Sequence, residues 1–173
     1  MNKQLSLISW IKNGFLVIVM GMVLGLGFCA WQVRSNQKIA AKGHTTEHLR
    51  YQARSLFAEA LQSGQSLRNA ILNPSDKKAF ENHEIAVKNC TELTGQIRAE
   101  LKTIPETETL LPDIGQIEEQ FEKLYKNHEQ LLKLAASGDS AGANRMLVTE
   151  ETPLWRKTKE TLNSFGEKVR VIR

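Results

Sequence analysis

Acidic side chains are missing from the first 43 residues of this chain, and residues 13–33 carry no charged side chain of either sign. At 1.5 Å per residue, a helix of that length covers about 31 Å, which matches the hydrocarbon core of a bilayer. Trp10 and Trp31 lie near its two ends, where indole rings favour the membrane interface. The pattern predicts a cytoplasmic stub at 1–12, a transmembrane helix at 13–33 and one exported domain at 34–173.

Processing signals are also missing around the apolar run. No small-x-small cleavage site follows it, and Phe28 stands before Cys29 where a lipoprotein signal needs a small residue. We therefore expect an uncleaved anchor. Positive charges flank the run on both sides, and a count of them alone would place the long domain inside the cell. Because long domains are translocated largely regardless of such charges, we expect the domain to be exported.

The region after the anchor has no excess of positive charge. The chain contains 23 Lys and Arg against 19 Asp and Glu, but the first 43 residues contain five of the basic residues and none of the acidic ones. Eighteen basic and 19 acidic residues remain for 44–173, a net charge of −1. This balance excludes nucleic acid as a partner of the exported domain, since binding to a polyanion needs a basic surface.

Proline is rare, with 4 in the chain, and apolar residues between the prolines recur at alternating spacings of three and four, which is typical of amphipathic helices. No strand pattern competes. Four helices joined by short turns predict an all-α fold, in which the N-terminal transmembrane helix continues into an antiparallel up-down four-helix bundle. The predicted inward faces are, in chain order, Leu49, Ala53, Leu56, Ala60, Ser63, Leu67 and Ile71; Phe80, His83, Val87, Cys90, Thr94, Ile97, Leu101 and Ile104; Ile114, Ile117, Phe121, Leu124, His128, Leu131 and Ala135; and Trp155, Thr158, Leu162, Phe165, Val169 and Ile172.

Turn residues predict the helix boundaries. The first helix should end before Pro74, with Asn73 as the N-cap of the second helix and Pro74 at its first position. The remaining predicted boundaries are a turn at 105–112, a C-terminal cap at Gly138, an N-cap at Asp139, and a fourth helix that begins weakly at 141–148 and is kinked or restarted near Thr152 and Pro153.

Catalytic motifs are absent: there is no nucleophile elbow, phosphate loop, paired-acid constellation or haem-attaching CxxCH. His44, Glu47 and His48 match H-x-x-E-H, but a metal needs a further ligand and a pocket, and a solvated helix face is the preferred interpretation. We predict a protein that is not an enzyme and has no cofactor and no metal site. Cys29 and Cys90 are too far apart to pair within one subunit, and Cys90 is interpreted as a small buried group.

Two groups of polar residues are candidates for ligand binding. Arg50 and Arg54 lie one turn apart, and Arg68 with Asn69 lies near the far end of the same helix. A guanidinium group pairs with both oxygens of a carboxylate, so these residues could hold an anionic ligand across a dimer interface; surface salt bridges are the alternative.

The second group consists of the polar residues on the predicted inward faces, His83, Cys90, Thr94 and His128. Buried polar groups lower stability unless each finds a partner. They are either paired histidines near the bundle ends or the lining of a polar cavity that receives a ligand between helices.

Two stretches carry a resemblance to a known family: LFAEALQSGQSLRNAILNPSDKKAFE across the first turn and LLKLAASGDSAGANRMLVTEETPLW across the third. The second contains an apolar run, then Gly-Asp, then an alanine-rich turn with a proline about a dozen residues later. In these motifs, and in an anchor that runs directly into the first helix, the chain resembles the periplasmic four-helix-bundle sensor domain of methyl-accepting chemotaxis receptors and related bacterial transducers. The matching residues of the second stretch are Gly138, Asp139, Ala141, Ala143 and Pro153.

The resemblance implies a homodimer in the bacterial inner membrane, with its sensor domain in the periplasm, that detects a small solute or a periplasmic binding protein and signals by a small helix displacement. It also implies a second membrane span after Arg173. Amino-acid-sensing members place several arginines on the first helix and a threonine on the fourth, which implies Thr152 or Thr158 as the partner of the arginines here; the arginine spacing differs from theirs. The alternatives are the sensor module of a histidine kinase or cyclase, and a stand-alone structural or metal-handling membrane protein.

Overall fold

The computed structural model describes the backbone of residues 2–172 and the side chains of residues 20–37, 43 and 45–172. Within 2–172 every regular element is a helix, so the predicted all-α class is confirmed. The chain divides into two compact units, residues 1–45 and 46–173. Helix α1, Asn2–Leu72, contributes residues to both units.

The first unit consists of the N-terminal part of α1. Its described side chains from Met20 to Val33 are largely apolar and exposed. Among the described residues, no helix contains a stretch that is both long and apolar enough to span a membrane. The side chains of 13–19, part of the span predicted at 13–33, lie outside the described residues. The transmembrane helix stays a prediction.

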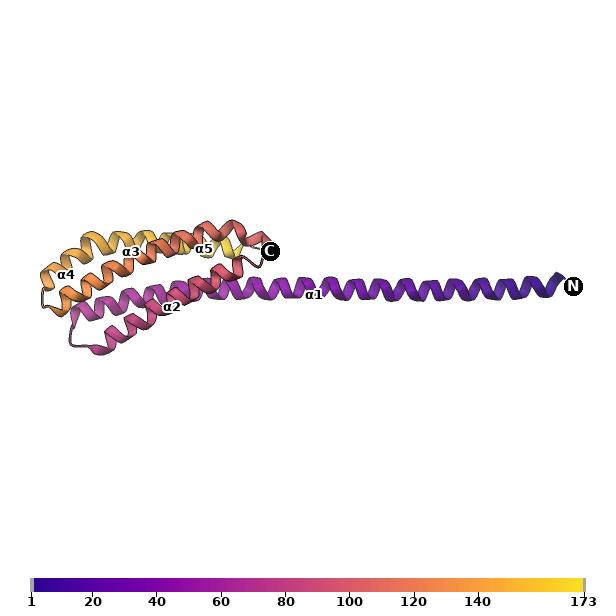
Figure 1. Ribbon diagram of the computed structural model, residues 1–173, viewed down its shortest axis with the longest axis horizontal. Helices are drawn as coiled ribbons and strands as arrows, with labels where there is room; N and C mark the ends of the chain where they lie inside the picture. The colour runs from indigo at the N-terminus through magenta and orange to yellow at the C-terminus, as the bar shows by residue number, and fades with distance from the viewer. Residues whose placement is uncertain (1, 173) are drawn as a thin grey trace. The chain divides into compact units, whose positions relative to one another are not determined.

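The second unit contains the rest of α1 and all later elements (Figure 1). These are α2 at Lys77–Leu101, the 3-10 helix η1 at Pro105–Leu110, α3 at Leu111–Ala136, α4 at Ser140–Met146, the π-helix η2 at Leu147–Glu151 and α5 at Thr152–Arg170.

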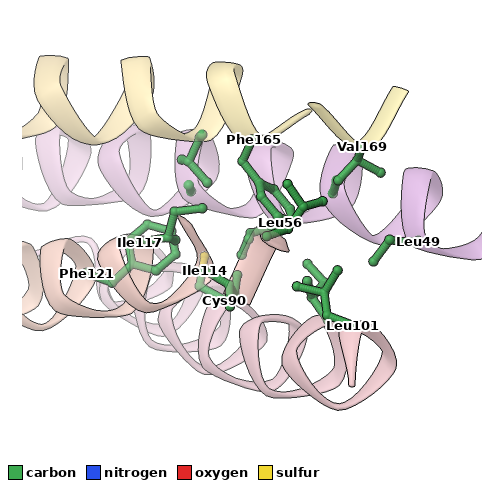
Figure 2. Close-up of a cluster of buried hydrophobic side chains, with 14 of the residues drawn as sticks. Leu49, Leu56, Cys90, Leu101, Ile114, Ile117, Phe121, Phe165 and Val169 are labelled. Carbon is green, nitrogen blue, oxygen red and sulfur yellow. The ribbon is translucent and has the colours of Figure 1, made fainter. Parts of the chain in front are cut away.

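Four helices of this unit share one hydrophobic core. Figure 2 shows side chains from α1, α2, α3 and α5 converging, among them Leu56, Cys90, Ile117 and Phe165. A second cluster joins α1, α3 and α4 through Leu67, Ile71, Leu131, Ala135, Ala143 and Met146. All seven inward residues predicted for α1, and all seven predicted for α3, are buried. The three-and-four spacing therefore located these two faces correctly.

The start of α2 differs from the prediction. Asp76 is the N-cap, since its Oδ1 accepts hydrogen bonds from the backbone N–H of Lys78 at 3.0 Å and of Ala79 at 3.3 Å. Asn73 instead forms a turn, in which its carbonyl accepts from the Asp76 N–H at 3.0 Å and its side chain accepts from the Ser75 hydroxyl at 2.7 Å. A carboxylate caps the positive N-terminal end of a helix at least as well as an amide does, so the helix begins after the acid.

The inward face of α2 is shifted in its first half. Ala79 and Ala86 are buried where Phe80 and Val87 were predicted, and the two larger side chains are only half-buried. Ala79 and Ala86, like Phe80 and Val87, are three or four positions from His83 and Cys90, so both sets of residues fit the helical period. Alanine, with its small side chain, fits where helices approach most closely, and larger side chains cover the flanks.

The remaining boundaries largely follow the sequence. Gly138 has a φ of 81°, which suits glycine, and the Asp139 carboxylate accepts the Gly142 N–H at 2.9 Å, so both caps are confirmed. The predicted turn at 105–112 is mostly η1, and α3 already begins at Leu111. The break predicted near Thr152 and Pro153 is a π-helical segment, η2, directly before Thr152.

The position of η2 has a local cause. Pro153 has no N–H, so it cannot donate to the carbonyl four residues earlier. Before it, the backbone N–H and the side-chain hydroxyl of Thr152 both donate to the Leu147 carbonyl, the hydroxyl at 2.8 Å. The wider π turn is therefore held at its end by a side chain as well as by the backbone.

Candidate functional site

A groove of about 310 Å³ lies between α1 and α5. Its apolar walls are formed by Ala53 and Phe57 of α1 and by Leu162 and Gly166 of α5. Its polar lining consists of Arg50, Arg54, Asn163, Glu167 and Arg170. Three guanidinium groups face one carboxylate there, so the groove carries an excess of positive charge. This volume and this mix of surfaces suit a small ligand that has an anionic group and an apolar part.

Arg50 connects the two walls of the groove. One of its terminal nitrogens, Nη2, donates to the Arg170 carbonyl and to the Ile172 carbonyl, each at 2.9 Å. Its other terminal nitrogen pairs with Glu47. The cation thus occupies the C-terminal end of α5, where helix carbonyls lack partners and the helix dipole is negative. Its Nε is buried without a hydrogen-bond partner in the described structure.

Arg54 is the free cation of the groove. It is exposed, and it forms no hydrogen bond or ion pair with the side chains that the structure describes. Arg170, by contrast, pairs with Glu167 at 2.7 Å. The sequence-predicted pair Arg50 and Arg54 is therefore brought to one groove, where Arg50 mainly caps α5 and Arg54 is available to an incoming anion.

The other predicted ligand residues lie elsewhere. Arg68 is exposed 14 residues after Arg54, about 21 Å further along the same helix. The backbone carbonyl of Asn69 accepts the Asn73 N–H at 2.9 Å as α1 ends. Thr158 is buried, and its hydroxyl donates to the Leu154 carbonyl at 2.9 Å. None of the three lines the groove, so within one chain the structure does not unite them with Arg50 and Arg54.

The second predicted group comes together in the interior. The rings of His83 and His128 lie 5.0 Å apart between their centres, and Tyr125 lies 5.7 Å from His128. Both histidines are buried. His83 uses its Nδ1 in a 3.0 Å hydrogen bond with the Ser63 carbonyl of α1. His128 has no hydrogen-bond partner for either ring nitrogen in the described structure. The two histidines are thus neighbours where three helices meet, and their interpretation as a pair or as the lining of a ligand cavity stays a prediction.

Cys90 and Tyr125 extend this polar interior toward Ser63. Burial raises the pKa of the Cys90 thiol to about 12, and burial next to Cys90 also raises the pKa of the Tyr125 hydroxyl. Both groups are therefore neutral at physiological pH. The Cys90 side chain is 0 % exposed, so the prediction that it is a buried group is confirmed.

Thr94, the fourth residue predicted in this group, is separate from the histidines. Its hydroxyl donates to the Cys90 carbonyl at 3.0 Å and to the Thr91 carbonyl at 2.9 Å. With Tyr125 it borders a shallow hollow of about 190 Å³ between α2 and α3. The hydroxyl is satisfied within its own helix, so it adds no free donor to the interior.

Glu151 belongs to this interior but was missed in the sequence. It is 1 % exposed at the end of η2, and its Oε1 lies 3.8 Å from His128 Nε2. Its Oε2 accepts a 3.3 Å hydrogen bond from the Thr152 hydroxyl. A signal did exist: a step of seven residues back from Thr158, two turns along the predicted inward face, leads to Glu151.

Of the two histidines in the H-x-x-E-H pattern, the structure describes the side chain of His48, which lies on the surface. His48 Nδ1 lies 2.9 Å from Glu100 Oε2, linking α1 to α2. The side chain of His44 lies outside the described residues. Among the side chains that the structure describes, no three His, Cys, Asp or Glu residues are placed to hold a metal ion.

Comparisons with known proteins add no family. No family model, no curated protein and no solved structure matches this chain.

Proposed function

We propose that this chain is the ligand-sensing module of a membrane-bound, chemotaxis-type signal transducer and is not an enzyme. In this proposal, the exported helices form an antiparallel four-helix bundle in the periplasm, two copies associate as a homodimer, and the helix at 13–33 anchors the module in the bacterial inner membrane. A sensor module of a histidine kinase or cyclase would work by the same physical mechanism.

One observation carries the proposal: the groove lies between α1 and α5. A ligand that contacts both of its walls binds better to one relative placement of the two helices than to others, and it shifts the population toward that placement by its difference in affinity. The resemblance of the two turn stretches to those of chemotaxis receptors supports the same proposal, because signalling in that family is expected to involve a helix displacement.

The groove also indicates the chemistry of the ligand. Arg54 supplies an exposed, unpaired guanidinium, and Phe57 with Leu162 supplies apolar surface beside it. An alkyl or aryl carboxylate presents both complementary parts, whereas an amino acid with a short side chain presents little apolar surface. Benzoate and butyrate are therefore the first probes, and L-aspartate is the polar comparison.

Isothermal titration of the full chain with each probe tests the proposal. Benzoate or butyrate should bind, and Arg54→Gln should weaken binding at least tenfold. Arg68→Gln is the matched control, since it removes an exposed arginine of the same helix outside the groove, and it should leave binding unchanged. The groove assignment is wrong if neither carboxylate binds, or if the two variants lose affinity equally.

A further inference from the structure

A carboxylate and two imidazoles are enclosed together in the second unit, apart from the groove residues. His83 comes from α2, His128 from α3 and Glu151 from η2. The side chains of His128 and Glu151 are each 1 % exposed. His128 has both ring nitrogens buried and without hydrogen-bond partners in the described structure. Burying a polar side chain without hydrogen bonds lowers stability, so such a group is a candidate for a functional role.

The charged and titratable groups around the site are few. On α1 the nearby acid is Glu59, which acts on Cys90 and Tyr125. On α2 Glu84 acts on His83, and the histidines act on each other. No Lys or Arg is among the groups found to act on His83, Cys90 or Tyr125. The titratable neighbours of His83 are therefore His128 and Glu84, and Glu151 is the buried carboxylate beside His128.

One proton fits this arrangement and a second does not. A proton on His128 can be balanced by Glu151, whose oxygen is 3.8 Å from His128 Nε2. A further proton on His83 would place two imidazolium groups with ring centres 5.0 Å apart in the buried interior, where Glu151 is the buried carboxylate. Burial lowers the pKa of His83, and the neighbouring His128 lowers it further.

We propose that His83, His128 and Glu151 form a buried proton-binding site that controls the packing of η2. Glu151 is the last residue of this π-helix, so a change in its charge balance acts directly on the element that separates α4 from α5. π-helical segments occur often at functional sites, and this one is short enough to rearrange locally. Entry of the second proton repels the histidines and loosens the contact of η2 with α3.

The sign of the pH dependence follows from linkage. A histidine with a lowered pKa in the folded state binds fewer protons there than in the unfolded state, once the pH falls to the ordinary histidine value of 6.5. The free energy of unfolding therefore decreases as the pH falls below that value. The loss continues until the pH reaches the lowered pKa of the folded state, below which it stays constant.

Hydrogen exchange of the unmodified full chain tests the proposal without any substitution. After correction for the intrinsic pH dependence of exchange, the amides of 147–152 should exchange at least tenfold faster at pH 5.5 than at pH 7.5. The amides of 114–124, in the centre of α3, serve as the internal reference. Equal protection of η2 at the two pH values, or an equal change in both segments, overturns the proposal.

A substitution then assigns the proton. Urea unfolding between pH 8 and 5, followed by far-UV circular dichroism, should show a smaller loss of stability in His83→Gln than in the unmodified chain. If His83→Gln keeps the full slope, the buried site does not bind the proton. The groove can still bind carboxylates in that case, so the two proposals fail independently.

Discussion

Two glycine-to-alanine substitutions are expected to change stability in opposite directions. Gly138 has a φ of 81°, and a Cβ added there would meet no atom within 4 Å. The cost of Gly138→Ala is therefore the backbone strain alone, about 1–2 kcal/mol for an alanine in a left-handed conformation. The lower entropy of the unfolded chain offsets about 0.4–1 kcal/mol of this. The net result should be a loss of about 1 kcal/mol.

Gly95 provides the matched change. It is exposed in the interior of α2, and a Cβ there also meets no atom within 4 Å. Alanine is favoured over glycine inside a helix by about 0.8–1 kcal/mol, so Gly95→Ala should stabilise the protein by that amount. The two variants should differ by roughly 2 kcal/mol although they add the same methyl group to equally open space.

Urea unfolding of the full chain, followed by far-UV circular dichroism, measures both changes. The midpoint should fall for Gly138→Ala and rise for Gly95→Ala with an unchanged slope, because neither substitution alters the buried surface. The reasoning is refuted if Gly138→Ala is neutral, since the turn would then not need a left-handed residue. It is equally refuted if both variants shift the midpoint the same way.

Three further predictions concern the core, the thiol and the end of α5. Phe165→Ala should lower the free energy of unfolding by about 3–5 kcal/mol, because Phe165 is 1 % exposed in the main core. Val148→Ala, at an exposed position, should change it by less than about 0.5 kcal/mol. Similar urea midpoints for the two variants would contradict this prediction. In a Cys29→Ser background, iodoacetamide at pH 8 should modify Cys90 only after the chain unfolds. Burial raises the pKa of the Cys90 thiol to about 12, so the thiol stays protonated in the folded chain. Rapid labelling of the native chain would show instead that the thiol is accessible. Arg50→Met should cost roughly 1–2 kcal/mol and speed hydrogen exchange in the last turn of α5, since two carbonyls lose a cationic donor; unchanged exchange would mean that this cap is not needed.

Periodicity predicted the parts of the fold that depend on burial alone. Along α3 every predicted inward position from Ile114 to Ala135 is buried, because this helix packs against its neighbours along one face and these positions lie on that face. The caps at Gly138 and Asp139 were also predicted correctly, because a glycine followed by an aspartate is typical of the end of one helix and the start of the next.

Features that depend on neighbouring elements were harder to predict. The choice of Asp76 over Asn73 as N-cap depends on which turn the chain forms around Pro74, and both residues are good caps. Ala79 rather than Phe80 is buried, although both positions fit the helical period, so periodicity alone does not choose between them.

The candidate sites were predicted in part for a similar reason. Arg50 and Arg54 were found because they lie on one helix, whereas Glu167 and Asn163 of the same groove come from α5 and have no pattern that links them to α1. Glu151 escaped because a glutamate between Thr149 and Pro153 has the composition of a turn. Its burial follows from its place two helical turns before the buried Thr158.

The π-helix η2 also determines how the buried face of α4 lines up with the buried face of α5. The buried residues Met146 and Glu151 are five positions apart, where a continuous α-helix would bury positions three or four apart. One extra residue is therefore accommodated between α4 and α5. Removal of Thr149 would bring Met146 and Glu151 to four positions apart, the spacing at which an ordinary helix keeps residues on one face, whereas the same deletion within α5 would turn every later side chain by about 100°. In this protein η2 is thus the place where the fourth helical segment tolerates a change of length by one residue.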